Sequence, residues 1–162
     1  MDTHGSIVNS ISTFFQEVDA SNWAAVQTML GKSVEVEHSN GEPGEIEYLS
    51  PSQIIEPWQA YLAGFDNTHH QIGTLRVDTK EQKAKASLYC TITHFLKEAK
   101  GGNVWRIYGA FDLALSNAGG AWVIDQMKFH NKFQEGNTEL PSLAKDRLKV
   151  EEGSNHSPSH AL

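Results

Sequence analysis

Three histidines and one aspartate have the spacing of a candidate acid–base site. His69 and His70 are adjacent in residues 67–74, and His94 follows about one strand length later. Imidazole titrates near neutral pH, so a histidine in a pocket can remove or deliver a proton, and a neighbouring carboxylate can fix its tautomer. Asp19, which follows an apolar helical pattern, can supply that carboxylate. We expect Asp19, His70 and His94 to face one internal pocket.

The strand pattern around His94 predicts that its side chain points inward. Between residues 84 and 96 alternate positions are small or apolar, and His94 belongs to this set, whereas the other set carries Lys85, Ser87 and Tyr89. Alternate residues of a strand share a face, so the set with His94 faces the core. A histidine there can also be a plain core residue bonded to the backbone, since buried polar groups are usually satisfied.

Residues 68–78 form a strand in which two apolar sets have opposite parity. His70 and Ile72 alternate on one face, while the apolar residues after Gly73 fall on the other. Both sets reach the core only if the strand slips by one residue, and a bulge at Gly73 would produce that slip. His70 then points inward, and His69 faces solvent or a partner subunit.

Three helices precede this strand and three further strands follow it. Helical spacing of apolar residues predicts helices at about residues 7–18, 23–30 and 54–65, with Thr3 or Ser6 as the first N-cap and Gly31 ending the second helix. A period of two predicts strands at about residues 34–38, 68–78, 83–97, 103–115 and 121–133, with a loop at 39–51. The predicted fold is α+β, in which a curved antiparallel sheet wraps three N-terminal helices around a pocket.

The length of 162 residues fits one domain with a C-terminal extension. Composition changes at Gly136, which places the domain at residues 1–137 and the extension at residues 138–162. A short helix is predicted at residues 143–150, and residues 151–162 are typical of a disordered tail. We expect the extension to be flexible.

The charge pattern excludes several classes of partner. The net charge is −7 and no Lys/Arg cluster is present, so neither nucleic acid nor an acidic membrane surface is an expected partner. No apolar run approaches the ~20 residues of a membrane helix. Cys90 is the only cysteine, which rules out an intramolecular disulfide, and the N-terminus has no secretory pattern. We therefore expect a cytoplasmic protein.

A known family shares this arrangement of residues. Scytalone dehydratase has a T-x-H-x-I-G-x segment that resembles residues 68–74 (Thr-His-His-Gln-Ile-Gly-Thr), and SnoaL-like polyketide cyclases have a matching strand. His94 matches the family's second inward histidine, and residues 19–23 are similar to its D-x-x-D-W turn. The resemblance covers residues 7–137 and implies a cone-shaped domain of the NTF2-like superfamily. It also implies that Asp19, His70 and His94 manage proton transfer in a polar pocket.

Two positions depart from the dehydratase pattern. Tyrosines that position a water and a carbonyl in the dehydratase correspond here to Val18 and His38, which implies another substrate or another detailed mechanism. The resemblance implies a cofactor-independent dehydratase, cyclase or isomerase that removes a proton next to a carbonyl of a polyketide- or steroid-like substrate. One histidine would be the base, and the other would donate to the enolate oxygen. The expected partners are a small apolar oxygenated substrate and further copies of the chain in a homodimer or higher homo-oligomer.

The pocket also needs walls, which we expect mainly from aromatic side chains, because small-molecule sites are apolar with a few convergent polar groups. Any one of these residues can instead belong to an ordinary core. The candidate substrate-binding residues are Phe15, Trp23, His38, Trp58, Tyr61, Phe65, Phe111 and Phe129.

Other chemistries are weaker interpretations of the same residues. A metal site is disfavoured because adjacent strand residues point to opposite faces, so we expect no metal and no cofactor. Cys90 lies in an apolar run, where a thiol stays protonated and is a poor nucleophile. A water-activating Asp-Arg-Asp relay would need Arg76, Arg106 and Asp112 to converge, which their spacing does not indicate. The histidines considered for the metal were His69, His70, His94 and His130.

A second hypothesis comes from a different class of function. Domains of this shape can serve as non-catalytic ligand-binding or dimerisation modules, and the outward strand face with Tyr89 and Phe95 could be buried in a dimer. Asp19 would then be only a cap or turn residue at the end of the first helix. A closed cavity, with His70 and His94 bonded only to the backbone, would favour this hypothesis.

Overall fold

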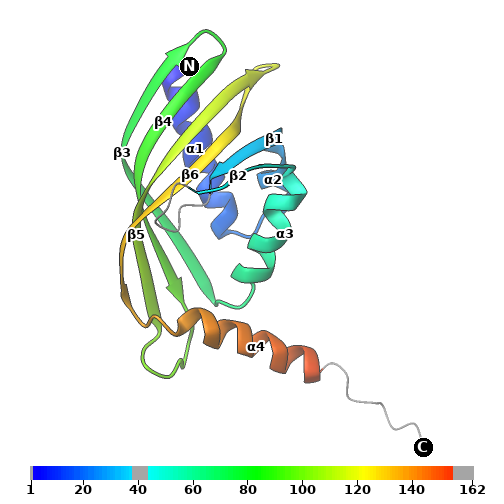
Figure 1. Ribbon diagram of the computed structural model, residues 1–162, viewed down its shortest axis with the longest axis vertical. Helices are drawn as coiled ribbons and strands as arrows, with labels where there is room; N and C mark the ends of the chain where they lie inside the picture. The colour runs from blue at the N-terminus through cyan, green and yellow to red at the C-terminus, as the bar shows by residue number, and fades with distance from the viewer. Residues whose placement is uncertain (1, 38–43, 155–162) are drawn as a thin grey trace, which may run out of the picture.

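The computed structural model describes residues 2–37 and 44–154 (Figure 1). The helices in these ranges are α1 (Thr3–Asp19), α2 (Trp23–Thr28), α3 (Pro51–Leu62) and α4 (Leu140–Ser154). The strands are β1 (Leu30–Glu37), β2 (Ile46–Leu49), β3 (Asn67–Lys80), β4 (Lys83–Phe95), β5 (Val104–Ala118) and β6 (Ala121–Gly136). Within the described ranges, no helix combines the length and the apolar character needed to cross a membrane.

The strands form one curved sheet in the order β2-β1-β6-β5-β4-β3. β3 to β6 make the predicted antiparallel meander, and β1 joins the edge of β6 in parallel. The sheet stays open, and α1, α2 and α3 lie on its concave side (Figure 1). The predicted α+β fold is therefore confirmed, and the concave side is where a pocket can form.

α1 brings the main apolar face of the core to the sheet. Its N-cap is Asp2, which accepts a hydrogen bond from the backbone N–H of Gly5, rather than the predicted Thr3 or Ser6. The residues that α1 buries recur at helical spacing and share one cluster with the inward side chains of β4. Full burial of each large side chain contributes roughly 2 kcal/mol. The buried residues of α1 are Ile7, Ile11, Phe14, Phe15 and Val18.

Two segments near β1 differ from the prediction. β2 lies within residues predicted to be loop and pairs with β1 at the sheet edge. Its residues Ile46 and Tyr48 are 52% and 69% exposed, so no apolar face marks it as a strand. α2 ends at Thr28, and Gly31, expected to follow a helix, lies in β1. A Cβ at Gly31 would collide with the Asp125 carboxylate, which explains the glycine.

The C-terminal extension is helical over most of its described part. α4 runs from Leu140 to Ser154 and so includes residues 151–154, which the composition assigns to a tail. Leu140 is fully buried and Ala144 is 1% exposed, and both join a second apolar cluster. That cluster also contains Phe65, Leu96 and Trp105.

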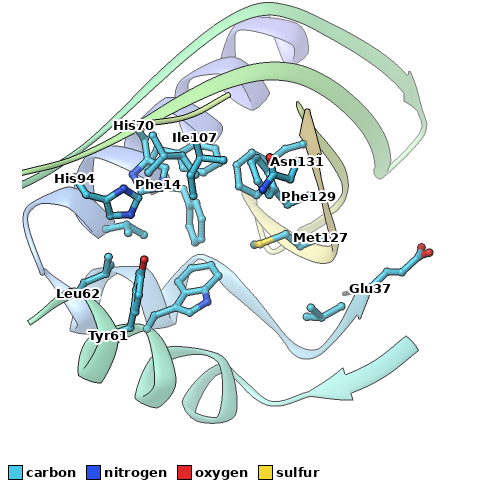
Figure 2. A pocket seen from close by; sticks show the side chains of 16 residues that line it. Phe14, Glu37, Tyr61, Leu62, His70, His94, Ile107, Met127, Phe129 and Asn131 are labelled. Atoms are coloured by element: carbon cyan, nitrogen blue, oxygen red, sulfur yellow. The ribbon is translucent and has the colours of Figure 1, made fainter. Parts of the chain in front are cut away.

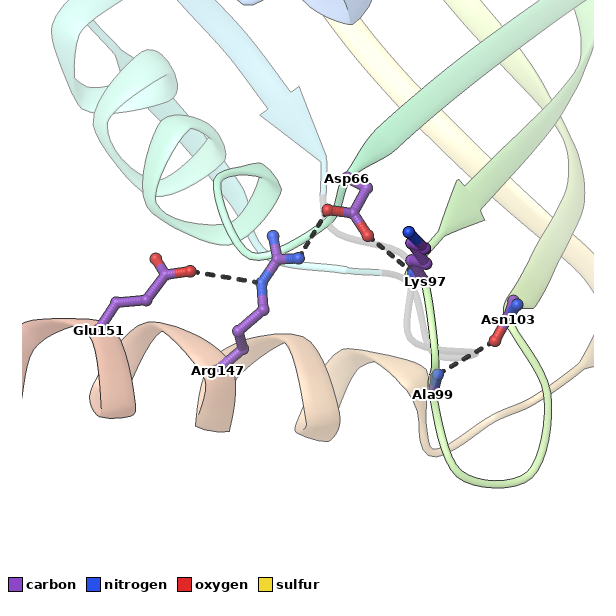
Figure 3. Close-up of polar contacts among 6 residues, drawn as sticks. All are labelled: Asp66, Lys97, Ala99, Asn103, Arg147 and Glu151. Atoms are coloured by element: carbon purple, nitrogen blue, oxygen red, sulfur yellow. Dashed lines mark hydrogen bonds and ion pairs between the residues drawn. The ribbon is translucent and has the colours of Figure 1, made fainter.

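Polar contacts fasten the same helix to the sheet (Figure 3). Nη1 of Arg147 lies 2.7 Å from Oδ1 of Asp66, and Oδ2 of Asp66 accepts the backbone N–H of Lys97 at 2.7 Å. The N–H donor and the Arg147 charge hold the pKa of Asp66 below its usual value. α4 is therefore anchored by buried apolar contacts and by a charge-assisted hydrogen bond.

β3 contains the predicted change of phase. Gly73 pairs with Tyr89 and Arg76 with Ser87, so three steps along β3 match two along β4 and one residue is extra. The residue in the left-handed region is Thr74, with φ of 50°, whereas Gly73 is not in that region. The predicted bulge is confirmed. The residue with the strained backbone is Thr74, however, and not Gly73, where the sequence placed the bulge.

A Thr74→Gly variant is expected to be more stable by about 1 kcal/mol. A β-branched residue in the left-handed region costs roughly 1–3 kcal/mol, and glycine adopts it freely while losing about 0.5–1 kcal/mol in backbone entropy. Urea unfolding measures the difference. Thr79→Gly is the matched control, because Thr79 is equally exposed but regularly paired with Ala84, and it should lower stability. A loss of stability in Thr74→Gly would contradict the assignment of strain.

Candidate active site

A cavity of about 520 Å³ lies between the concave face of the sheet, α1 and α3 (Figure 2). That volume suits a small organic ligand. Most of its wall is apolar, and the polar side chains in it come from few positions. The lining residues are Phe14, Phe15, Val18, Val36, Glu37, Trp58, Tyr61, Leu62, His70, Ile92, His94, Ile107, Phe111, Met127, Phe129 and Asn131.

Asp19, the last residue of α1, positions the side chain of His70. Oδ1 of Asp19 lies 2.6 Å from Nδ1 of His70 and accepts a hydrogen bond from the Thr68 hydroxyl at 3.1 Å. Oδ2 accepts the backbone N–H of His70 at 2.7 Å. The two side chains are 18% and 10% exposed, for Asp19 and His70 respectively. The carboxylate is thus fixed by three hydrogen-bond donors at the end of a helix.

The charge state of Asp19 sets the tautomer of His70. Burial raises the pKa of Asp19, but the hydrogen bonds from His70 and Thr68 and the attraction of the imidazole outweigh it, so the pKa falls below its usual value. An ionised carboxylate only accepts, so Nδ1 of His70 carries a proton and Nε2 is the free basic nitrogen. The His70 ring also packs against Phe15, with ring centroids 5.3 Å apart.

His94 lies on the same inner face, two residues along the ladder from His70. His70 is opposite Ile92, and His94 is opposite Thr68, so the two histidines are diagonal neighbours on β3 and β4. His94 is 3% exposed, and its ring stacks on Trp105, with ring centroids 4.5 Å apart. The inward orientation predicted from strand alternation is confirmed for both histidines.

Burial keeps His94 neutral. Burial lowers the pKa of His94 to about 4. The hydrogen bond to the Trp105 carbonyl raises this pKa, and the nearby His70 lowers it further. The contact to the carbonyl oxygen joins Nδ1 of His94 at 3.4 Å, and a carbonyl only accepts. Nδ1 therefore carries the proton, and Nε2 is an acceptor. In this tautomer Nε2 of His94 can accept a hydrogen bond, which differs from the donor role that the family resemblance implies for one of the histidines.

The predicted wall residues divide into three groups. Phe15, Trp58, Tyr61, Phe111 and Phe129 line the cavity. Two others do not line it: Trp23 packs against the main core, and Phe65 lies behind His94 in the cluster with α4. His38 lies outside the described residues.

Several lining residues were not singled out from the sequence. Strand parity could have found Ile107 and Met127, which are opposite Ile92 and Leu113 on the inner face. Asn131 could also have been found this way, because it shares the parity of Met127 and Phe129, and the register shift in β6 comes only after it, between Asn131 and Phe133. Sequence alternation thus identifies inward residues up to a bulge but not across it.

Among the described residues, those considered for the relay, the metal site and the thiol nucleophile do not form a site. Asp112 pairs with His130 at 2.7 Å on the outer face, and Arg106 lies 3.6 Å from Glu135, so these groups do not form a relay. No three His, Cys, Asp or Glu side chains of residues 2–37 and 44–154 are grouped to hold a metal ion. Burial raises the pKa of the Cys90 thiol to about 12, with a further contribution from Asp19, so the thiol stays protonated.

Comparison with solved structures shows the same fold in several proteins. A protein of Kribbella flavida, Kfla4162, is 16% identical, with a TM-score of 0.77 over 86% of this chain and 96% of the other. A candidate scytalone dehydratase of Novosphingobium aromaticivorans is 11% identical, with a TM-score of 0.72 over 83% and 87%. A hexachlorocyclohexane dehydrochlorinase, LinA type 2, is 14% identical, with a TM-score of 0.68 over 84% and 89%.

Comparison at the level of sequence gives the family. No protein of curated function matches the chain significantly. Residues 1–128 match the SnoaL-like domain, and this range includes α1 to α3, β1 to β5, the first half of β6 and both pocket histidines. The solved structures share an NTF2-like fold with it. The chain therefore belongs to the SnoaL-like family of NTF2-like domains.

Proposed function

We propose that the protein is a cofactor-independent enzyme that removes a proton next to a carbonyl group of a small, apolar, oxygenated substrate. Elimination, cyclisation or isomerisation of the resulting enolate would follow. One observation carries the proposal: the Asp19–His70 pair, with Oδ1 and Nδ1 2.6 Å apart, directs a basic imidazole nitrogen into a largely apolar cavity. A general base needs this combination of a positioned lone pair and a partner for the proton it gains.

His70 is the base in this mechanism. Its Nε2 takes the substrate proton, and the ionised Asp19 stabilises the imidazolium that forms, while the hydrogen bonds to Oδ2 and from Thr68 keep the carboxylate in place. Asp19 does not line the cavity, so it acts through His70 rather than on the substrate. The two side chains are only 10% and 18% exposed, for His70 and Asp19 respectively, and this burial strengthens the electrostatic interaction between the pair.

The relatives support an elimination reaction. The descriptions of two structural neighbours name a dehydratase and a dehydrochlorinase, and both have this fold. Loss of water and loss of hydrogen chloride each remove a proton from carbon and a leaving group from its neighbour. We propose this reaction class for the present chain, with the substrate set by its own cavity.

Deuterium incorporation into a simple bicyclic ketone tests the proposal without the natural substrate. 2-Tetralone is incubated in D₂O with the protein, and NMR follows loss of the α-proton signal. A positioned base is expected to speed exchange by about 10² or more over buffer. The urea-unfolded protein is the control for non-specific catalysis. A native protein that binds the ketone but exchanges no faster than buffer would instead favour a non-catalytic ligand-binding module.

A further inference from the structure

Two polar atoms at one end of the cavity have no hydrogen-bond partner among the described residues. One is Nε2 of His94, and the other is the hydroxyl oxygen of Tyr61. Both residues line the cavity, and Figure 2 shows the Tyr61 hydroxyl directed into it on the side of His94. His94 is 3% exposed, so its free nitrogen can be satisfied only by something inside the cavity.

The packing around these two atoms holds them in place. The Tyr61 ring meets His94 edge-on with centroids 6.0 Å apart and packs on Phe65 at 5.4 Å. His94 is stacked on Trp105, whose Nε1 donates to Gln134 at 2.7 Å. Phe65 and Trp105 hold the buried His94 ring, whereas Tyr61 is 43% exposed and is positioned by its contacts with Phe65 and His94. These contacts place the two polar atoms at the same end of the cavity.

The two atoms have complementary hydrogen-bonding roles. Burial raises the pKa of Tyr61 to about 12, so the phenol is neutral and can donate. His94 carries its proton on Nδ1, where the Trp105 carbonyl accepts it, and Nε2 can only accept. One donor and one acceptor thus face the same space.

We propose that Tyr61 and His94 together form a binding site for a hydroxyl group of the substrate. The hydroxyl donates to Nε2 of His94 and accepts from the Tyr61 hydroxyl. A carbonyl or ether oxygen can only accept, so it would leave Nε2 buried without a partner. The inference rests on the proposed function and narrows its substrate class to uncharged, hydroxylated ring compounds.

The position of the site also limits where that hydroxyl lies. His70 and His94 are diagonal neighbours on the inner sheet face, which places them about 7–8 Å apart. A substrate that places one carbon at Nε2 of His70 therefore has its hydroxyl within a few bonds of that carbon. Tyr61 and His94 would then determine specificity, while His70 and Asp19 carry out the proton transfer.

A pair of matched probes tests this inference by binding alone. 2-Naphthol can donate and accept, whereas 2-methoxynaphthalene has the same ring and can only accept. Isothermal titration is expected to show that the wild-type protein prefers the naphthol by about tenfold, the worth of the hydrogen bond that only the naphthol can donate to Nε2 of His94. In Tyr61→Phe, which keeps the ring packing, both probes lose the hydrogen bond from the Tyr61 hydroxyl, so both affinities should fall by about three- to tenfold while the preference remains. Tyr48→Phe removes a hydroxyl that is 69% exposed and outside the cavity lining, and it should leave both affinities unchanged.

A spectroscopic readout separates this role from a structural one. On adding 2-naphthol, but not the ether, the ¹⁵N resonance of His94 Nε2 should move toward the protonated position. Equal wild-type affinities for the two probes, or affinities that do not change in Tyr61→Phe, would overturn the hydroxyl site. Because binding needs no turnover, loss of the hydroxyl preference in a protein that still exchanges deuterium refutes this inference alone. The reverse result refutes only the proposed function.

Discussion

Asp19→Asn is expected to slow deuterium exchange into 2-tetralone by about 10²–10³-fold with little change in fold. The asparagine oxygen is drawn to the backbone N–H of His70, which Oδ2 of Asp19 accepts at 2.7 Å in the wild-type protein. The amide nitrogen then faces Nδ1 of His70 and donates to it. That contact moves the imidazole proton to Nε2, so the nitrogen in the cavity is no longer a base.

The matched control makes the same change at the other His–carboxylate pair. Asp112 lies 2.7 Å from His130 on the outer face, and their side chains are 58% and 40% exposed. Asp112→Asn should therefore exchange the ketone at the wild-type rate. ¹⁵N spectra of the imidazoles report the tautomer directly, and thermal unfolding checks the fold. If Asp19→Asn exchanges as fast as the wild-type protein, His70 is not the base.

The free energy of unfolding is expected to fall by about 3 kcal/mol between pH 6.5 and pH 4 because of His94 alone. Burial lowers its folded-state pKa to about 4, whereas an unfolded histidine titrates near 6.5. In this window the unfolded chain binds the proton and the folded protein does not, so acid favours unfolding. The stability that the neutral His94 contributes is fully present above pH 6.5 and is lost as the pH falls to 4.

Urea unfolding at a series of pH values measures this slope. His94→Gln removes the titrating group, so the slope between pH 6.5 and 4 should flatten, although the variant loses the stacking on Trp105 at every pH. His69→Gln is the control, because the exposed His69 on the opposite face of β3 makes none of these contacts. The lowered pKa of Asp19 adds a loss in the same direction at still lower pH. A slope that is equal in His94→Gln and the wild-type protein would contradict the assignment.

Regular alternation made part of the fold predictable from sequence. β4 has inward residues at every second position from Ala84 to His94, so its buried face and the orientation of His94 followed directly. The bulge in β3 was predictable because His70 and Val77 could not otherwise both point inward. The contact between Asp19 and His70 needed the family resemblance as well, since residues 51 apart leave no local trace.

Other features left too little signal in the sequence. β2 is an exposed edge strand, so its residues show no buried face. α4 buries only Leu140 and Ala144 among many charged residues, which resembles the composition of a tail. The Tyr61–His94 pair depends on how α3 packs across the sheet, and its ring contact joins segments whose relative placement no periodicity encodes. Long-range packing of this kind is settled by the whole core.

The extra residue in β3 also bears on how the strand can change in length over evolution. The segments on either side of Thr74 are in opposite phase, and each has its own inward set. A relative that lost this one residue would keep its sheet only if one of the two segments exchanged its faces. If that were the segment before Thr74, the side chain at the position of His69, rather than that of His70, would enter the cavity. Relatives that differ by one residue here should therefore be compared by the face their histidines occupy and not by column in an alignment.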